Sequence, residues 1–109
     1  MALPHAGSGE PIVLAPGAID FAQAHSVALA KTAHMELIRL VLQKGKAMPM
    51  HSVDGELSLQ CLHGELAVEA HGRAIVLHPG EMLFLAGGEP HAVVAQQDSV
   101  GLLTMLLTA

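Results

Sequence analysis

Apolar and polar positions alternate along most of the second half of the chain. In the clearest case, residues 65–71, the apolar residues Leu66, Val68 and Ala70 are each separated by one other residue. Such alternation is typical of a β-strand with one buried face, because successive side chains of a strand point to opposite sides. The pattern, together with short apolar runs, predicts strands at residues 56–62, 65–71, 73–78, 82–85, 91–95 and 100–107.

Glycines separate these segments at nearly regular intervals. The successive spacings are ten, nine, eight, eight and eight residues in the series Gly45, Gly55, Gly64, Gly72, Gly80 and Gly88. Short strands bounded by turn residues every 8–12 positions are typical of a β-sandwich or a β-barrel. The intervals leave no room for helices of ten or more residues. We therefore expect an all-β domain.

The first third of the chain is less regular. Residues 35–43, MELIRLVLQ, precede Lys44 and Gly45 and fit either a strand or a helix that ends before a glycine. Residues 20–23 fit either a capped helical turn or a loop. We expect residues 1–17 to be a flexible N-terminal leader and residues 18–109 to form one domain.

Composition favours a domain with a partner. The chain has 109 residues, of which 51% are hydrophobic and 14% charged. A domain of this size leaves about a third of its unfolded-chain surface exposed. Because so much of the chain is apolar, we expect another protein surface to cover part of it, and we predict a homodimer.

Charge and residue content argue against nucleic-acid-binding, membrane-spanning and secreted proteins. The net charge is −5 with only five Lys and Arg, and Phe21 and Phe84 are the only aromatic residues other than histidine. Nucleic-acid binding requires a basic face or a stacking platform, so we exclude it. No apolar run approaches the ~20 residues of a membrane span, and the N-terminus lacks the pattern of a secretory signal. The single cysteine, Cys61, reads as a small buried hydrophobe that forms no intrachain disulfide, which favours a cytoplasmic location.

Two segments resemble the two motifs of the small single-domain cupins of the RmlC-like, cupin-2 barrel type. The first runs from Gly45 through His51 to Gly64, and the second runs from His78 through a Pro-Gly turn to His91. The resemblance covers about residues 33–107. It implies a cupin double-stranded β-helix, or jelly-roll barrel, and it implies that residues 35–43 form a strand.

The resemblance also implies where a metal would bind. Cupins that use a metal hold it with three histidines and a carboxylate or amide, and the first and last of these histidines correspond to His51 and His91. The other two ligand positions fall on Val53 and Leu57. Glu56 lies one position from the expected carboxylate and is the weakest candidate ligand. Two imidazoles and waters would hold a divalent transition metal only weakly.

The remaining expected neighbours of the two histidines are apolar. By parity and resemblance we expect the barrel pocket to be lined by Met48 or Met50, and by Val53, Leu57, Leu59, Phe84 and Val93. An apolar cavity with a few convergent polar groups is the general form of a small-molecule site. The same side chains would also suit an ordinary filled barrel core. We expect three other histidines, His63, His71 and His78, to face solvent at turns.

Three functions follow from these observations. The first is binding of a small molecule that His51 and His91 orient in the apolar pocket. The second is a metal-dependent enzyme, such as a dioxygenase or isomerase acting on a small organic acid or phenol, with an incomplete set of ligands. The third is an inert dimerising domain with a filled core. The sequence leaves these alternatives, and the question of catalysis, open.

Overall fold

The fold is all-β over the residues that the computed structural model describes, 5–14 and 19–108. Nine strands are present there: β1 Val27–Lys31, β2 Met35–Leu42, β3 Ala47–His51, β4 Leu57–His63, β5 Leu66–Ala70, β6 Arg73–Leu77, β7 Met82–Leu85, β8 His91–Ala95 and β9 Ser99–Leu106. They form a five-stranded sheet in the order β1-β2-β9-β4-β7 and a four-stranded sheet in the order β3-β8-β5-β6. Every strand pair is antiparallel.

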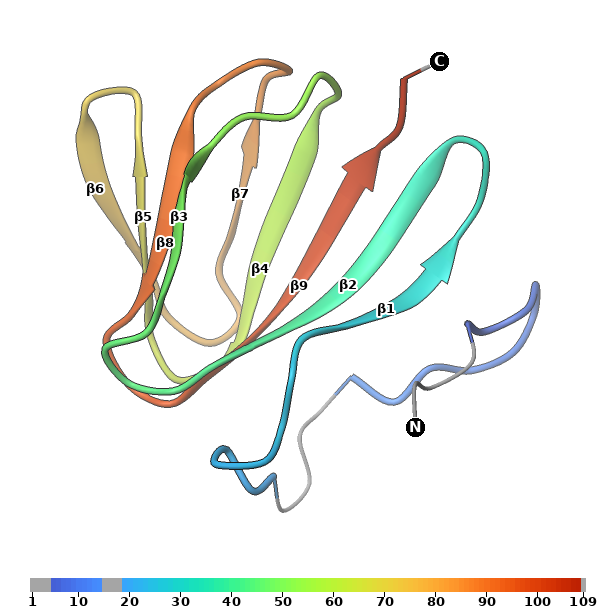
Figure 1. Cartoon of the computed structure of the whole chain (residues 1–109), viewed down its shortest axis with the longest axis horizontal. Coiled ribbons are helices and arrows are strands. Elements are labelled where there is room, and N and C mark those ends of the chain that lie inside the picture. The colour runs from blue at the N-terminus through green and yellow to red at the C-terminus, as the bar shows by residue number, and fades with distance from the viewer. Residues whose placement is uncertain (1–4, 15–18, 109) are drawn as a thin grey trace.

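The two sheets face each other and join at one end (Figure 1). The β2–β3 and β8–β9 connections cross between the sheets at the lower end of that view, whereas the β3–β4 and β7–β8 loops lie at the upper end. His51 ends β3 and His91 begins β8, so both histidines lie toward the upper end. We call this end the barrel mouth.

The six strands predicted in the second half of the chain are present within one or two residues of their expected bounds. Residues 35–42 are strand and not helix, because their whole length pairs with β9, from Met35 opposite Leu106 to Leu42 opposite Ser99. β1 and β3 were not predicted. β3 contains Pro49 and lies at the edge of its sheet, where a residue without a backbone N–H is tolerated.

The interior is filled by apolar side chains from both sheets. The buried cluster consists of Leu40, Leu57, Leu59, Cys61, Leu66, Val68, Ala70, Leu77, Leu85, Val93, Ala95 and Leu103. These are the inward positions of the alternating strands, as the pattern predicted. Cys61 is fully buried, which confirms its interpretation as a small core residue.

The N-terminal part of the chain lies against the five-stranded sheet. Ala6 donates its backbone N–H to the carbonyl of Leu29 in β1, and the Arg39 guanidinium of β2 donates to the carbonyl of Val13. Asp20 forms a turn, because its side chain accepts from the N–H of Ala22 and its carbonyl from that of Ala24. Residues 1–4 and 15–18 of the predicted leader region and its boundary lie outside the described residues.

Within ranges 5–14 and 19–108 there is no helical segment with the length and hydrophobicity needed to cross a membrane.

Candidate functional site

A bulge in β3 sets the direction of the first histidine. Met48 pairs with Val93 and His51 pairs with His91, so three steps along β3 match two steps along β8. The extra residue of a β-bulge shifts the alternation by one position. Met48 and His51 therefore share a face, although their spacing would place them on opposite faces of a regular strand. Val93, on the same face, is 1% exposed, which identifies that face as the barrel interior.

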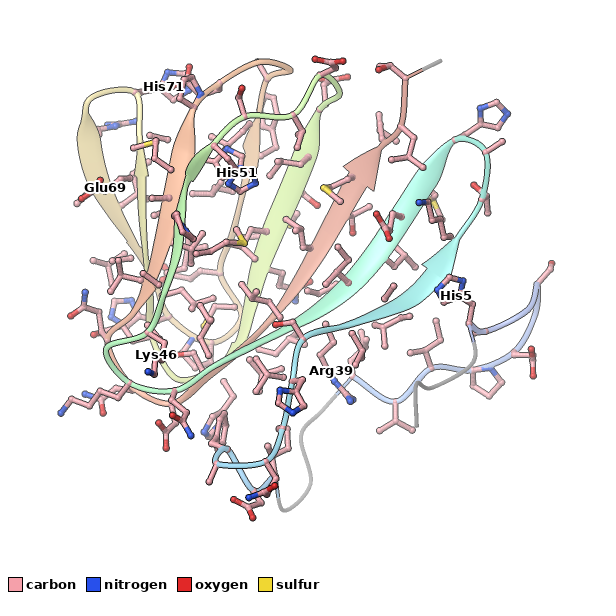
Figure 2. All side chains as sticks on the ribbon, in the orientation of Figure 1. His5, Arg39, Lys46, His51, Glu69 and His71 are labelled. Carbon is pink, nitrogen blue, oxygen red and sulfur yellow. The ribbon has the colours of Figure 1, made fainter. Side chains whose placement is uncertain are left out.

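The two imidazoles lie directly against each other. The centroids of the His51 and His91 rings are 4.5 Å apart, and the ring planes make an angle of 53°. In the view of Figure 2 the ring of His51 lies between β3 and β4, on the inner side of its strand. The structure thus brings together two residues that are 40 positions apart in the sequence, at the barrel mouth.

A backbone carbonyl two residues upstream orients each ring. The Nδ1 atom of His51 lies 3.0 Å from the carbonyl oxygen of Pro49, and the Nδ1 atom of His91 lies 2.9 Å from that of Glu89. A carbonyl oxygen only accepts hydrogen bonds, so Nδ1 carries the proton in both rings. In the neutral imidazole Nε2 is then a lone-pair acceptor. In this tautomer both rings offer the same atom, Nε2, to a ligand.

Burial distinguishes the two histidines. His91 is 2% exposed, whereas His51 is exposed at the rim of the mouth. The Nε2 atom of His91 is buried and has no hydrogen-bond partner among the described residues. Leaving a buried polar atom without a partner costs about 1–3 kcal/mol. Such a cost at an otherwise well-packed position marks the atom as a candidate ligand contact.

Five of the expected pocket residues point into the barrel. Leu57, Leu59 and Val93 belong to the buried cluster, and Met48 and Val53 are partly buried and pack against it. These side chains form a filled core below the two histidines. The polar atoms of the two rings therefore lie at the mouth, above a layer of apolar side chains.

Three expected site residues lie elsewhere. Phe84 is 70% exposed, because it pairs with Ser58 on the outer face of the large sheet, so its prediction as a pocket residue is wrong. Met50 is 55% exposed on the outside of the small sheet, so its placement in the pocket is wrong too. Glu56 lines a surface hollow beside Phe84 and is not a third ligand beside the histidines.

The donors at the mouth do not fit a resident catalytic metal. In the described part of the chain no three His, Cys, Asp or Glu side chains come close enough to hold one ion. Catalytic sites usually supply three protein ligands and keep an open position for water or substrate. Here Val53 and Leu57 occupy the positions where the resemblance places the missing ligands, and hydrocarbon side chains coordinate no cation.

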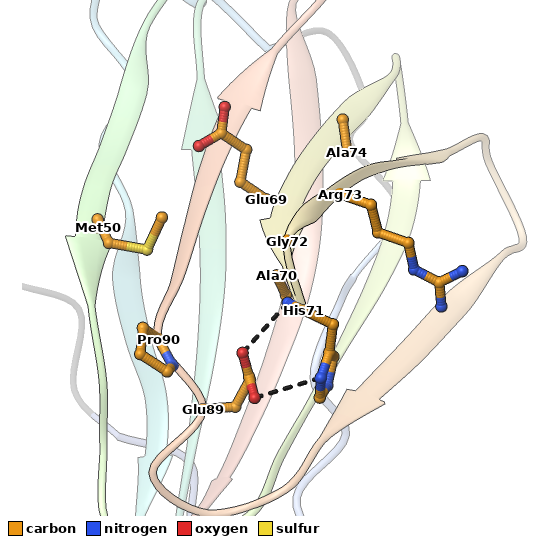
Figure 3. Close-up of a pocket in the computed structure, with 9 residues that line it drawn as sticks. All are labelled: Met50, Glu69, Ala70, His71, Gly72, Arg73, Ala74, Glu89 and Pro90. Carbon is orange, nitrogen blue, oxygen red and sulfur yellow. Dashed lines mark hydrogen bonds and ion pairs between the residues drawn. The ribbon is translucent and has the colours of Figure 1, made fainter.

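A second group of polar side chains lines a groove outside the barrel (Figure 3). The groove has a volume of about 490 Å³ and is lined by Met50, Glu69, Ala70, His71, Gly72, Arg73, Ala74, Glu89 and Pro90. Glu89 accepts from the backbone N–H of His71 and lies 3.3 Å from its Nδ1. That contact holds the β5–β6 turn, in which His71 has a positive φ of 53°. Sequence reasoning found no signal for this groove.

His78, one of the three histidines predicted to face solvent, lies between two carboxylates. His63, His71 and His78 are all exposed, as predicted. The His78 ring lies 3.0 Å from Glu81 through Nδ1 and 2.9 Å from Glu65 through Nε2. The hydrogen bond to Glu81 is the main reason why the pKa of His78 lies above its ordinary value of 6.5. The pKa of Glu81 is lowered, chiefly because it accepts the backbone N–H of His78.

This cluster gives a pH prediction with a definite sign. We expect an NMR titration of His78 to have its midpoint above 6.5, and Glu81→Gln to lower it. Because the folded pKa is raised, the stabilisation is complete below the unfolded value and is lost as the pH rises through the folded one. The lowered pKa of Glu81 keeps its carboxylate ionised to a lower pH, so the pair is lost at the acidic end only when the pH falls through that pKa. A His78 midpoint that is the same in wild type and Glu81→Gln would contradict the pairing.

Comparison with known proteins gives structural matches alone. The sequence matches no protein-family model and no curated protein. A cupin-superfamily protein from Desulfitobacterium hafniense has a TM-score of 0.75 at 17% identity, covering 91% of this chain and 100% of the other. An RmlC-like cupin from Shewanella frigidimarina has a TM-score of 0.72 at 18% identity, covering 76% and 75%. A salicylate 1,2-dioxygenase variant from Pseudoaminobacter salicylatoxidans has a TM-score of 0.69 at 15% identity, covering 73% of this chain and 25% of that enzyme.

Proposed function

Since the chain has the cupin fold, as the matched structures establish, we propose that it binds a small molecule at the barrel mouth, oriented by His51 and His91. His91 supplies the buried polar contact and His51 the contact at the rim. The apolar side chains beneath them cover the apolar part of the ligand. Sites of this form are concave and mostly apolar, with a few placed polar groups.

The observation that carries the proposal is the unpartnered Nε2 of His91. Its ring is anchored through Nδ1, so it cannot satisfy Nε2 by changing tautomer without losing the bond to the Glu89 carbonyl. No donor among the described residues reaches this nitrogen, so we expect it to accept a hydrogen bond from a bound molecule. A ligand with an O–H or N–H group, such as an alcohol, a phenol or an amine, provides one. A carboxylate would place a second acceptor against the lone pair.

The metal-dependent dioxygenase or isomerase is the second candidate. The anchored Nδ1 atoms favour it, because metal-ligating histidines commonly donate their other nitrogen to a carbonyl or carboxylate. The number of donors argues against it. An inert domain is the third candidate. It gives no reason for burying the Nε2 atom of His91 without a hydrogen-bond partner, which lowers stability.

The test uses phenol as the probe and benzoate as its anionic counterpart. We expect phenol to shift the ¹⁵N resonance of His91 Nε2 in wild-type protein, and benzoate to shift it much less. In His91→Leu we expect phenol affinity, measured by calorimetry, to fall by roughly tenfold or more, because a hydrogen-bond contact of about 1–3 kcal/mol is lost. The matched control is His71→Leu, which removes an exposed histidine from the outer groove and is expected to leave phenol binding unchanged.

The stability of the same variants separates the proposal from a purely structural role. In His91→Leu the loss of the Nδ1 bond is offset by removal of the unpartnered nitrogen, so we expect unfolding free energy to stay within about 1 kcal/mol of wild type. Equal phenol binding in wild type and His91→Leu would contradict the proposal. About one equivalent of Fe, Mn, Ni, Zn or Cu in purified protein, lost in His51→Ala, would instead support the enzyme, whereas less than about a tenth of an equivalent would exclude it.

A further inference from the structure

Glu89 contacts two parts of the small sheet through two different groups. Its carboxylate lies against the β5–β6 turn, where Oε2 accepts the backbone N–H of His71 at 3.1 Å (Figure 3). Its backbone carbonyl accepts from Nδ1 of His91, the first residue of β8, at 2.9 Å. This one residue therefore connects a turn beside the outer groove to the buried imidazole at the barrel mouth.

The β5–β6 turn is a fixed point for the carboxylate. His71 and Gly72 connect the two strands, and their φ angles of 53° and 72° are both positive, as a type I′ hairpin turn requires. The hairpin sets the direction of the His71 N–H. A hydrogen bond from a backbone N–H to an ionised carboxylate is stronger than one to a neutral acceptor. The Glu89 side chain is only 23% exposed, so water competes little for this bond.

The ring of His71 contributes less to this anchor than its backbone does. Its Nδ1 atom lies 3.3 Å from Oε1 of Glu89, and the ring is 53% exposed. Exposed pairs of this kind usually contribute little, because solvent screens them. His71→Leu removes the ring but keeps the backbone N–H, which agrees with its use as the control for phenol binding. The bond to the His71 N–H is therefore the contact that holds Glu89.

The chain direction at Glu89 links its side chain to its carbonyl. Pro90 follows, and a residue before a proline is restricted to extended conformations. The Glu89 carbonyl therefore has little freedom to turn relative to its own side chain. On the other side of the loop, the N–H of Gly88 donates to the carbonyl of Val53 at 2.8 Å. A displacement of the Glu89 side chain is passed to its carbonyl, and from there to the His91 ring.

The other histidine of the mouth has no comparable support. Nδ1 of His51 lies against the carbonyl of Pro49, and proline has no polar side chain that could anchor that carbonyl. His51 is also exposed at the rim, whereas His91 is buried. The ring with the buried, unpartnered Nε2 is thus the one whose orienting carbonyl is itself held in place.

We propose that Glu89 is a positioning residue for the ligand site. Its carboxylate, anchored on the His71 N–H, holds the Glu89 carbonyl where it keeps the proton of His91 on Nδ1 and leaves the Nε2 lone pair free to accept. Without the anchor the Nδ1 bond weakens, and the ring exchanges with the tautomer in which Nε2 carries the proton and accepts nothing. This role rests on the proposed function, because the state of Nε2 matters to a molecule that binds it.

The first measurement is the ¹⁵N spectrum of the histidine rings in the full chain without ligand, at a pH where the rings are neutral. It distinguishes a protonated ring nitrogen from an unprotonated one. We expect Glu89→Ala to move the His91 Nε2 resonance toward the protonated position. Glu89→Gln keeps an oxygen that can accept the His71 N–H and should retain the wild-type resonance. His51, oriented by the Pro49 carbonyl, is the internal control and should be unchanged in both variants.

The second measurement is phenol affinity by calorimetry. Glu89→Ala should raise the phenol dissociation constant by roughly fivefold, because the acceptor nitrogen is protonated part of the time. Glu89→Gln should stay within about twofold of wild type. The matched control is Glu69→Ala, which removes the other carboxylate of the outer groove. Figure 3 marks no hydrogen bond or ion pair on Glu69 among the residues drawn, so affinity and the His91 resonance should both be unchanged.

A shifted resonance and a weaker affinity in Glu89→Ala, both restored in Glu89→Gln and both absent in Glu69→Ala, support the proposal. An unchanged His91 resonance in Glu89→Ala overturns it. So does a shift of equal size in Glu89→Gln or Glu69→Ala, which would mean that carboxylate charge acts on His91 through space. Unchanged phenol affinity in Glu89→Ala, when His91→Leu weakens binding, overturns it as well.

The failure of this role is distinguishable from the failure of the ligand site. Phenol that binds wild type and His91→Leu equally contradicts the ligand site. The ligand-free resonance of His91 then still decides whether Glu89 orients the ring, because that measurement involves no phenol.

Discussion

Leu59→Ala is expected to lower the free energy of unfolding by about 2–5 kcal/mol. Leu59 is 2% exposed and lies between Leu83 on one neighbouring strand and Leu103 on the other. Truncation removes its transfer free energy and leaves a cavity whose walls belong to both sheets, so the site cannot collapse readily. Urea unfolding of wild type and Leu59→Ala measures the change. Both proteins are compared at the same concentration, because any self-association would add to the apparent stability.

The control for this change is Val76→Ala. Val76 is 44% exposed on the outer face of β6, and its truncation is expected to cost less than about 0.5 kcal/mol. If Leu59→Ala were as mild as Val76→Ala, the interior beneath the two histidines would be an open cavity and not a packed core. The ligand would then bind deep in the barrel and not at its mouth.

Gly64→Ala is expected to destabilise the protein by roughly 3 kcal/mol. Gly64 follows β4 with a φ of +82°, in the left-handed region that favours glycine. A Cβ at this position would overlap the carbonyl oxygen of Asp98 and the hydroxyl of Ser99. The Ser99 hydroxyl is buried and accepts the backbone N–H of Glu65 at 2.9 Å. It cannot move away without breaking this hydrogen bond, which joins the β4–β5 turn to the start of β9.

Gly72→Ala separates strain from overlap. Gly72 has a similar φ of +72°, but a Cβ there meets no atom within 4 Å. Only the backbone penalty applies, which is about 1–2 kcal/mol. Calorimetric melting of the two variants should place Gly64→Ala well below Gly72→Ala. Equal melting temperatures would mean that the Asp98–Ser99 segment yields to the added methyl group, and that the close approach does not constrain the fold.

The strands were predictable because their signal is local. Alternation in residues 65–71 and the spacing of the glycines require knowledge of a few neighbours only, and the structure confirms the corresponding strands. Residues 35–43 were ambiguous, since an apolar run suits a helix or a strand until its partner is known. That partner is β9, more than 55 residues later in the sequence. β3 was missed because Pro49 and two methionines give it no alternation.

The direction of side chains was predictable only where alternation is present. MLFL, residues 82–85, is apolar throughout and gives no indication of which side faces inward. Pairing with β4 decides this, because Phe84 opposite Ser58 faces outward and Leu85 opposite Leu57 faces inward. His51 shows the reverse problem. Its inward direction depends on a bulge between Met48 and His51, which only the register with β8 reveals.

The sequence by itself determined an all-β chain whose alternating apolar residues form the interior. It also determined that two histidines stand at the first and last histidine positions of the cupin-like motifs. Those features depend on residue types and on spacings of a few residues, and both are present in the chain whatever its tertiary structure. Tertiary structure alone decided that the rings meet at 4.5 Å, that carbonyls two residues upstream orient them, and that His91 Nε2 is buried without a partner. These properties depend on strand register, because a shift of one residue reverses the face on which every side chain lies.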